Sequence, residues 1–334
     1  MNSETHPLHQ LQAFLTSKIV GQARLVERLL LALLADGHLL VEGAPGLAKT
    51  RAIRALADGL EADFQRIQFT PDLLPGDVTG TDIFRPQTGA FEFQPGPIFH
   101  NLVLADEINR APAKVQAALL EAMAERQVSV GTQTYTLPPL FLVMATQNPI
   151  EQEGTYPLPE AQLDRFLLHV FVDYPDADAE RAILRLVRDE LREAAQLNSG
   201  ASAQPENKTR GQFNAVSAES IFAARREVLA LHMAEAVEEY IVQLVIATRQ
   251  AQAYGDDLSG WIDFGASPRA TLALDRCSRA YAWLRGADFV TPDDVRAIAH
   301  DALRHRIIVS FEAEANGIDA DRVISTLLDR VPAA

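Results

Sequence analysis

The sequence has little cysteine, no long apolar run and a shortage of basic residues. One cysteine, Cys277, occurs in 334 residues, which excludes an intrachain disulfide and a cysteine-rich metal site. We expect it to be a small, partly buried apolar residue. The longest apolar stretch, 29–41, is interrupted by Asp36 and His38 and is too short to span a bilayer. Residues 1–10 are polar and lack the apolar core of a signal peptide, so the sequence predicts a cytoplasmic protein without membrane insertion.

Acidic residues outnumber basic ones. The chain has 45 Asp and Glu against 30 Lys and Arg, which gives a formal net charge of −15. Contacts with nucleic-acid phosphates and with anionic lipid both need clustered Lys and Arg. The charge balance therefore disfavours a general nucleic-acid binder and docking on an anionic membrane. The hydrophobic fraction of 48% is ordinary for a globular protein with a sizeable core, and the length suggests two domains or one large one.

Short apolar runs alternate with helical patterns in the first half of the chain. This alternation is typical of an α/β fold, with a parallel sheet sandwiched by crossover helices. Apolar spacing predicts helices at 49–60 and 114–127. A stretch rich in Pro, Gly, Asp and Thr at 70–97 predicts a long structured loop that could include a small hairpin, and alternation at 128–136 predicts a β-hairpin. The five predicted strands are 38–41, 66–69, 102–105, 141–145 and 167–172.

The second half of the chain changes in character after Tyr174-Pro175. A charged helix is expected at 179–194 and a surface loop rich in Ser, Asn, Gln and Gly at 198–211. From Ser217 onward the periodicity predicts an all-α lid of about four helices. Thr291-Pro-Asp-Asp294 has the form of a helix start with Thr as the N-cap. The predicted organisation is an α/β domain at 1–175, a connecting helix and loop at 176–216, and a helical lid with a C-terminal tail at 217–334.

A glycine-containing loop joins the first predicted strand to the first predicted helix, which is the context of a phosphate-binding loop, or P-loop. Backbone N–H groups of such a loop and the helix N-terminus attract a β-phosphate. Lys49 would reach the β- and γ-phosphates of ATP, and Thr50 would place its hydroxyl on Mg²⁺. The plainer alternative is a turn before an ordinary helix. The residues expected around the nucleotide here are Gly43, Ala44, Pro45, Gly46, Leu47, Ala48, Lys49, Thr50 and Arg51.

Polar residues follow the third and fourth predicted strands. Asp106 and Glu107 after an apolar strand form a Walker B motif, in which Asp106 would hold Mg²⁺ directly or through water. Glu107 would polarise the attacking water as the general base. Solvated acids after a strand are common, but the upstream P-loop favours the catalytic interpretation. Asn148 would lie between the first and third strands and could orient water or sense the γ-phosphate, although Asn before Pro is also a turn former.

The residues from the P-loop to Arg165 resemble the MoxR family of AAA+ ATPases. The resemblance covers roughly positions 19–306, and the family often has alanine at the position of Ala48, where the usual P-loop has its last glycine. A helix's first turn has negative φ, so alanine is sterically acceptable there. The segments that carry the resemblance are QFTPDLLP at 68–75, PGPIF at 95–99, LADEINRA at 104–111, ATQNPIEQEG at 145–154 and LPEAQLDRF at 158–166.

The resemblance implies roles for single residues. Ile19 and Val20 resemble the segment that lies over the adenine, and Asn148 resembles sensor 1. Arg165 resembles the arginine finger that reaches the γ-phosphate on a neighbouring subunit. Arg269 resembles sensor 2 at the start of a lid helix. Arginine suits both tasks because its charge is permanent and its fork of donors grips phosphate oxygens; the alternative for both is a surface salt bridge.

Two further residues have open interpretations. Arg110 could face the subunit interface, cap the helix that begins near Lys114, or pair with Glu107. Gln68 could restrain Glu107 until a partner binds, or it could be structural. The predicted hairpin at 128–136 corresponds to one that lines the central pore in relatives.

The resemblance implies a Mg²⁺-dependent ATPase that forms a ring, expected to be a hexamer. Such a ring couples ATP hydrolysis to remodelling, maturation or activation of client proteins, usually with a partner that carries a von Willebrand factor A domain. An arginine finger from a neighbour makes hydrolysis depend on assembly. The alternatives are a metal-chelatase motor subunit, a nucleic-acid-directed motor and a scaffold without turnover. The sequence shows no platform of aromatic and basic residues for stacking nucleic-acid bases, which disfavours the second alternative. The last is disfavoured by the intact set of Lys49, Asp106, Glu107, Asn148, Arg165 and Arg269.

Overall fold

A five-stranded parallel sheet forms the centre of the molecule. The computed structural model describes residues 6–44, 46–47, 49–149, 154–198 and 213–333, with the backbone alone at 193–198. The strand order is β2-β5-β8-β1-β9 and every neighbouring pair is parallel, which confirms the predicted sheet. The strands are β1 (Leu39–Gly43), β2 (Phe64–Gln68), β5 (Leu102–Asp106), β8 (Leu142–Gln147) and β9 (Leu168–Val172).

Helices cover both faces of this sheet because its central strands are apolar on both sides. Successive residues of a strand point to opposite faces. Leu39 and Val41 of β1 accordingly pack into one buried cluster and Leu40 packs into the other. The first cluster includes residues of α1 (Pro7–Lys18), α2 (Ala23–Leu34) and α3 (Lys49–Gly59), and the second includes residues of α4 (Pro75–Thr79) and α5 (Ala113–Glu125).

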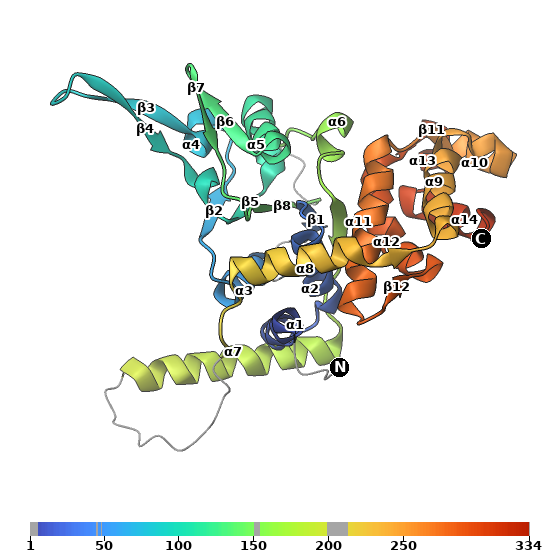
Figure 1. Cartoon of the computed structure of the whole chain (residues 1–334), viewed down its shortest axis with the longest axis horizontal. Coiled ribbons are helices and arrows are strands. Elements are labelled where there is room, and N and C mark those ends of the chain that lie inside the picture. Colours follow the sequence, from blue (N-terminus) through green and yellow to red (C-terminus); the bar gives the residue numbers. More distant parts are fainter. Residues whose placement is uncertain (1–5, 45, 48, 150–153, 199–212, 334) are drawn as a thin grey trace.

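Two β-hairpins project from the same end of the molecule (Figure 1). The loop predicted at 70–97 contains the antiparallel hairpin of β3 (Gly80–Arg85) and β4 (Ala90–Pro95), followed by a short helical turn, η1 (Pro97–Phe99). The second hairpin consists of β6 (Gln127–Val130) and β7 (Gln133–Thr136), and it confirms the β-hairpin predicted at 128–136. The Phe93 and Tyr135 rings stack with centroids 3.8 Å apart, so the two hairpins support one another.

The C-terminal half is helical, as predicted, but has more helices than the expected four or so. The helix expected at 179–194 is longer, α7 (Ala177–Asn198), and most of the loop expected at 198–211 lies outside the described residues. The capping box of Thr291 and Asp294 confirms the predicted helix start. The helices that follow are α8 (Ala218–Ala230), α9 (Glu235–Arg249), α10 (Asp256–Trp261), α11 (Pro268–Leu284), α12 (Pro292–Leu303), α13 (Phe311–Ala315) and α14 (Ala320–Arg330).

Short elements complete the described chain. Two strand pairs of two or three residues each brace the helical part: β10 (His232–Met233) with β12 (Phe289–Val290), and β11 (Ile262–Phe264) with β13 (Ile308–Val309). The remaining turns are η2 (Ile108–Arg110), α6 (Glu160–Leu163), η3 (Ala251–Tyr254) and η4 (Arg304–Arg306).

A buried ion-pair network ties α2 to α12 and η4. Asp301 is fully buried and accepts hydrogen bonds from Arg24 at 2.8 Å and Arg28 at 2.7 Å, and it also pairs with Arg304. Burial alone would raise the pKa of Asp301, but the charges of Arg28, Arg304 and Arg24 outweigh burial and hold the pKa below its ordinary 3.8. The contribution of Asp301 to stability is therefore present above pH 3.8 and is lost as the pH falls through the lowered pKa.

Replacing Asp301 by alanine is expected to lower the free energy of unfolding by about 3–5 kcal/mol, because buried arginines lose their counter-charge. The measurement is urea unfolding at pH 7, with the thermal midpoint as a second reading. Asp329→Ala is the matched control, since Asp329 is exposed on α14 and pairs with no other side chain in the described chain. Equal unfolding curves for the two variants would show that the network does not stabilise the fold.

Candidate active site

The carboxyl ends of three adjacent strands bring most of the predicted residues together. β8 lies between β5 and β1, as predicted, and ligands of open parallel sheets bind at this edge. A pocket of about 410 Å³ opens there, which we call the phosphate pocket. It is lined by Gly46, Leu47, Lys49, Thr50, Arg51, Arg66, Asp106, Glu107, Thr146 and Asn148. Arg66 and Thr146 were not among the residues predicted from the sequence.

The P-loop side chain Lys49 is held over the ends of β1 and β8. Its ammonium donates to the Gly43 carbonyl at 2.6 Å and lies 3.4 Å from the Gln147 carbonyl. Burial lowers the pKa of Lys49, while the carboxylates of Asp106, Glu107 and Glu42 oppose that change. Gly46 has φ of +84°, in the region that favours glycine. Ala44 is buried beside it; the predicted site residues Pro45 and Ala48 lie outside the described residues.

Asp106 is oriented by two side chains from neighbouring strands. Its Oδ1 accepts from the Thr146 hydroxyl at 2.6 Å, and its Oδ2 accepts from Arg66 at 2.6 and 3.0 Å. The Thr146 oxygen also accepts from the Glu107 backbone N–H at 2.9 Å. One threonine thus fixes the position of both Walker B residues, with Glu107 in a left-handed conformation at φ of +56°.

The Glu107 carboxylate has two partners in this structure. Gln68 donates to its Oε2 at 2.9 Å, and the Arg110 guanidinium lies 3.2 Å from the same oxygen. This hydrogen bond is the contact expected if Gln68 restrains the Glu107 side chain. Of the three interpretations of Arg110, the pairing with Glu107 is formed; an interface role stays a prediction.

The oxygen ligands at this edge fit Mg²⁺. Thr50 and Asp106 line the same pocket, and Mg²⁺ is usually bound by one or two protein oxygens together with water and substrate phosphates. Arg66 occupies one carboxylate oxygen of Asp106, so a cation there would compete with a guanidinium. In the described part of the chain no group of three or more His, Cys, Asp or Glu side chains could hold a metal by itself.

An apolar slot of about 220 Å³ continues from the phosphate pocket and shares Gly46, Leu47 and Arg51 with it. Ile19 and Val20, which resemble the segment that lies over the adenine, line this slot. Ile183 and Leu186 of α7 also line it. An apolar slot next to a phosphate site suits a purine base.

Arg51 lies between this slot and the phosphate pocket and lines both. Its guanidinium donates to the Lys18 carbonyl at 2.9 Å and pairs with Glu190 of α7 at 2.6 Å. The slot is therefore tied to both the N-terminal helix and α7.

Arg165 and Arg269 lie away from the phosphate pocket of their own chain. Both line a separate cavity of about 320 Å³, which we call the arginine cavity. The Arg165 guanidinium donates to the Leu120 carbonyl at 2.6 Å, and that of Arg269 lies 3.7 Å from Asp164. The sequence predicted both residues but not that they would lie together.

Asp164 joins this region to the helical part of the chain. It accepts from the Ser267 hydroxyl at 2.7 Å and from the buried Arg306 at 2.8 Å. Ser267 is the N-cap of α11, and its oxygen accepts from the Arg269 backbone N–H at 3.1 Å. Both arginines therefore stand on a fixed backbone.

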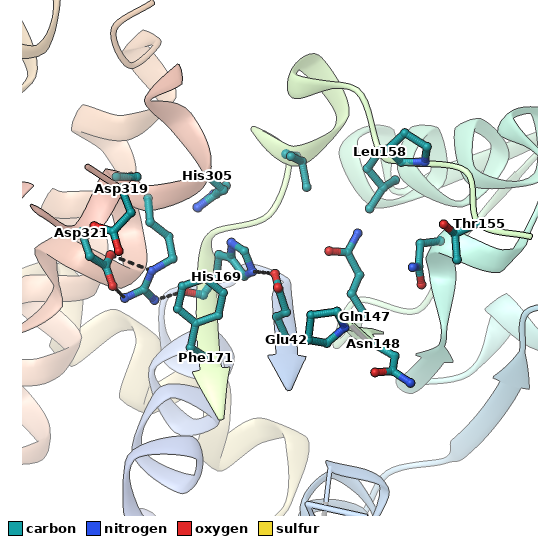
Figure 2. A pocket seen from close by; sticks show the side chains of 16 residues that line it. Glu42, Gln147, Asn148, Thr155, Leu158, His169, Phe171, His305, Asp319 and Asp321 are labelled. Carbon is teal, nitrogen blue, oxygen red and sulfur yellow. Dashed lines mark hydrogen bonds and ion pairs between the residues drawn. The ribbon is translucent and has the colours of Figure 1, made fainter. Parts of the chain in front are cut away.

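A further cavity, of about 520 Å³, is lined by Gln147 and Asn148 at the end of β8, among other residues (Figure 2). Figure 2 shows the Glu42 carboxylate of β1 facing the His169 ring of the neighbouring strand β9. The His169 Nε2 and a Glu42 carboxylate oxygen are 3.0 Å apart. The His169 carbonyl accepts from Arg304 at 2.6 Å. These contacts link β1, the strand that leads into the P-loop, to β9 and η4.

Comparisons with known proteins match both parts of the chain to known families. Residues 38–168 match the ATPase family associated with various cellular activities (AAA), and residues 260–327 match an AAA lid domain. These matches lie within the segments predicted as the α/β domain and the lid. No described helix is long and apolar enough to cross a membrane.

Individual relatives resemble the chain over nearly its whole length. It is 44% identical to chaperone MoxR1 of Mycobacterium tuberculosis, over 98% of this chain and 83% of the relative. It is 34% identical to protein MoxR of Paracoccus denitrificans, over 90% of this chain and 88% of that relative. A crystal structure from Cytophaga hutchinsonii, described as that of an ATPase, superposes with a TM-score of 0.85 at 42% identity, over 98% of this chain and 95% of the other. The chain therefore belongs to the MoxR family of AAA ATPases.

Proposed function

We propose that this ATPase hydrolyses ATP with Mg²⁺ at sites shared between neighbouring subunits of a ring, expected to be a hexamer. The observation that carries this proposal is the separation of Arg165 and Arg269 from the phosphate pocket of their own chain. Two arginines suited to phosphate are then presented on a different surface, where another subunit's nucleotide can meet them.

The phosphate pocket supplies the residues that act within one subunit. Lys49 and the P-loop backbone bind the β- and γ-phosphates, and Asn148 at the end of β8 orients the water or the γ-phosphate. Glu107 takes the proton of the attacking water as the general base. Thr50 and Asp106 hold Mg²⁺, which when bound neutralises charge on the phosphate oxygens.

The arginine cavity supplies the residues that act on the neighbour. Arg165 stabilises the charge that develops on the transferred phosphoryl group, and Arg269 binds phosphate from the start of α11. Such a contact between unlike surfaces is heterologous, and it closes into a ring when the rotation between subunits closes. Nucleotide state and subunit angle become linked in such a ring.

Subunit mixing tests the shared site. Glu107→Gln and Arg165→Ala proteins are each expected to be nearly inactive. Random mixing at equal amounts should create complete sites at about a quarter of the interfaces, where an intact Glu107 meets a neighbour's intact Arg165. Activity in the mixture supports the proposal, and a mixture no more active than its components overturns it.

We also propose a restraining role for Gln68. A Gln68→Ala protein without partners should hydrolyse ATP about threefold to tenfold faster than the wild type, because a hydrogen bond to a carboxylate is removed. Initial rates at saturating ATP measure this. Gln65→Ala is the control, because Gln65 lies on the opposite face of β2. A slower Gln68→Ala protein would mean that Gln68 aligns Glu107 and does not restrain it.

We infer from the name of the M. tuberculosis chaperone and from the family resemblance that the energy of hydrolysis remodels or activates client proteins. The expected partner carries a von Willebrand factor A domain, and the hairpin β6–β7 is the expected client contact in the pore. Purification of the tagged Glu107→Gln protein with ATP, followed by mass spectrometry, tests this. Recovery of nucleic acid or of a metal-chelatase complex in place of such a partner would contradict it.

A further inference from the structure

Arginines outnumber carboxylates among the described residues that line the arginine cavity. In a chain of net charge −15, such a concentration is unusual and needs an explanation. The charged residues that line the cavity are Arg126, Arg165, Arg269, Arg276 and Arg306 against Asp36 and Asp164.

Two of these arginines are neutralised within the chain. Arg126 pairs with Asp36 at 2.6 Å, and Arg306 pairs with Asp164 at 2.8 Å. Arg165 is bound to a carbonyl, and Arg269 lies 3.7 Å from a carboxylate that already has closer partners. Arg276 is exposed and makes no hydrogen bond or ion pair with any described residue.

The geometry of α11 presents Arg269 and Arg276 together. Seven residues separate them, which is two helical turns, so they lie on one face about 10 Å apart along the axis. Leu272 and Ala273 line the cavity between them. Leu274 and Cys277 are buried in the core, which fixes this face toward the cavity.

Other charges on the same helix do not share this arrangement. Arg279 donates to Asp275 at 2.8 Å and to the Leu231 carbonyl, and does not line the cavity. Among the arginines of α11, Arg276 therefore combines a place on the cavity wall with a guanidinium that no carboxylate of the described residues neutralises.

Cations held close together without counter-charge repel one another and attract an anion. The anion must fit a recess of about 320 Å³, which excludes a nucleic-acid duplex and suits a short polyphosphate. An arginine fork can bind two phosphate oxygens at once. Side chains that start two turns apart can both reach a chain of three phosphates lying between them.

We propose that Arg276 binds the polyphosphate of the ATP held by the neighbouring subunit, beside Arg165 and Arg269. This inference rests on the shared site proposed above. It adds a binding residue that the sequence motifs do not mark.

The first experiment compares Arg276→Ala with the wild type in steady-state ATP hydrolysis. Loss of a charged hydrogen-bonding group is expected to lower kcat/KM by about tenfold or more, whereas Arg276→Lys, which keeps the charge, should recover part of it. Arg322→Ala is the control, since Arg322 is exposed on α14 and its side chain has no partner in the described chain. Thermal unfolding and sizing of each variant detect a merely structural effect.

The second experiment asks which subunit Arg276 serves. Arg276→Ala protein is mixed with Glu107→Gln protein, which has an intact arginine cavity but no general base. If Arg276 acts on the neighbour, the mixture should be severalfold more active than the mean of its two components. A mixture at or below that mean overturns the proposal, as does an Arg276→Ala protein that behaves like Arg322→Ala.

The two proposals fail separately. If mixing Glu107→Gln with Arg165→Ala restores activity while Arg276→Ala is indistinguishable from its control, the shared site stands and the role of Arg276 is wrong. If the Arg165 mixture also fails to recover, the shared site itself is wrong.

Discussion

An Arg165→Ala protein is expected to lose a factor of about 10³–10⁵ in kcat for ATP hydrolysis, the range over which arginine fingers act. The loss arises because the charge that develops on the transferred phosphoryl group is no longer stabilised by the guanidinium of Arg165. ATP binding should persist, since Lys49, the P-loop and the apolar slot belong to a different surface. Single-turnover hydrolysis and binding of a fluorescent ATP analogue separate the two effects.

Arg165→Lys distinguishes charge from geometry in the same assay. It keeps the positive charge but lacks the planar fork, so we expect a partial loss of kcat. Sizing must show that the ring still forms in each variant, because a dissociated protein would be inactive for another reason. An assembled Arg165→Ala protein with wild-type kcat would contradict the role of Arg165.

A Glu107→Gln protein is expected to lose a factor of about 10²–10⁴ in kcat, the usual contribution of a general base. Glutamine has nearly the same shape and can still form a hydrogen bond with Gln68, but it cannot accept the proton of the attacking water. Quenched-flow single-turnover hydrolysis measures the loss directly. ATP should remain bound and uncleaved, which makes this variant suitable for trapping the assembled ring.

Glu61→Gln is the matched control for the loss of one carboxylate. Glu61 is exposed after α3 and does not line the phosphate pocket, so its rate should equal that of the wild type. Hydrolysis by Glu107→Gln at the wild-type rate would mean that another group activates the water.

The sequence predicts those site residues that belong to a motif following a strand, because parallel strands bring their carboxyl ends to one edge of the sheet. Lys49, Asp106 and Asn148 converge for this reason. The contact of Arg66 with Asp106 depends on the pairing of β2 with β5, which no local pattern encodes. Thr146 stands inside a segment that resembles the family, yet its hydrogen bonds depend on β8 lying next to β5.

The helical half is predicted less completely, because some of its helices are short and because some of its contacts depend on tertiary packing. The helices α10 and α13 have six and five residues, too few for apolar periodicity to be visible. The sequence predicts a charged helix at the position of α7, but not that one of its faces lines the apolar slot. The meeting of Arg165 and Arg269 requires the tertiary contact between Asp164 and Ser267, which sequence spacing cannot reveal.

The most direct test of the shared site is the ATP hydrolysis rate per subunit across protein concentrations, with the oligomer sized at each concentration. We expect the rate per subunit to rise over the same concentrations at which rings form, and to be close to that of Glu107→Gln when the protein is monomeric. A monomer that hydrolyses ATP at the full rate would contradict the account, because every residue needed for catalysis would then lie within one chain.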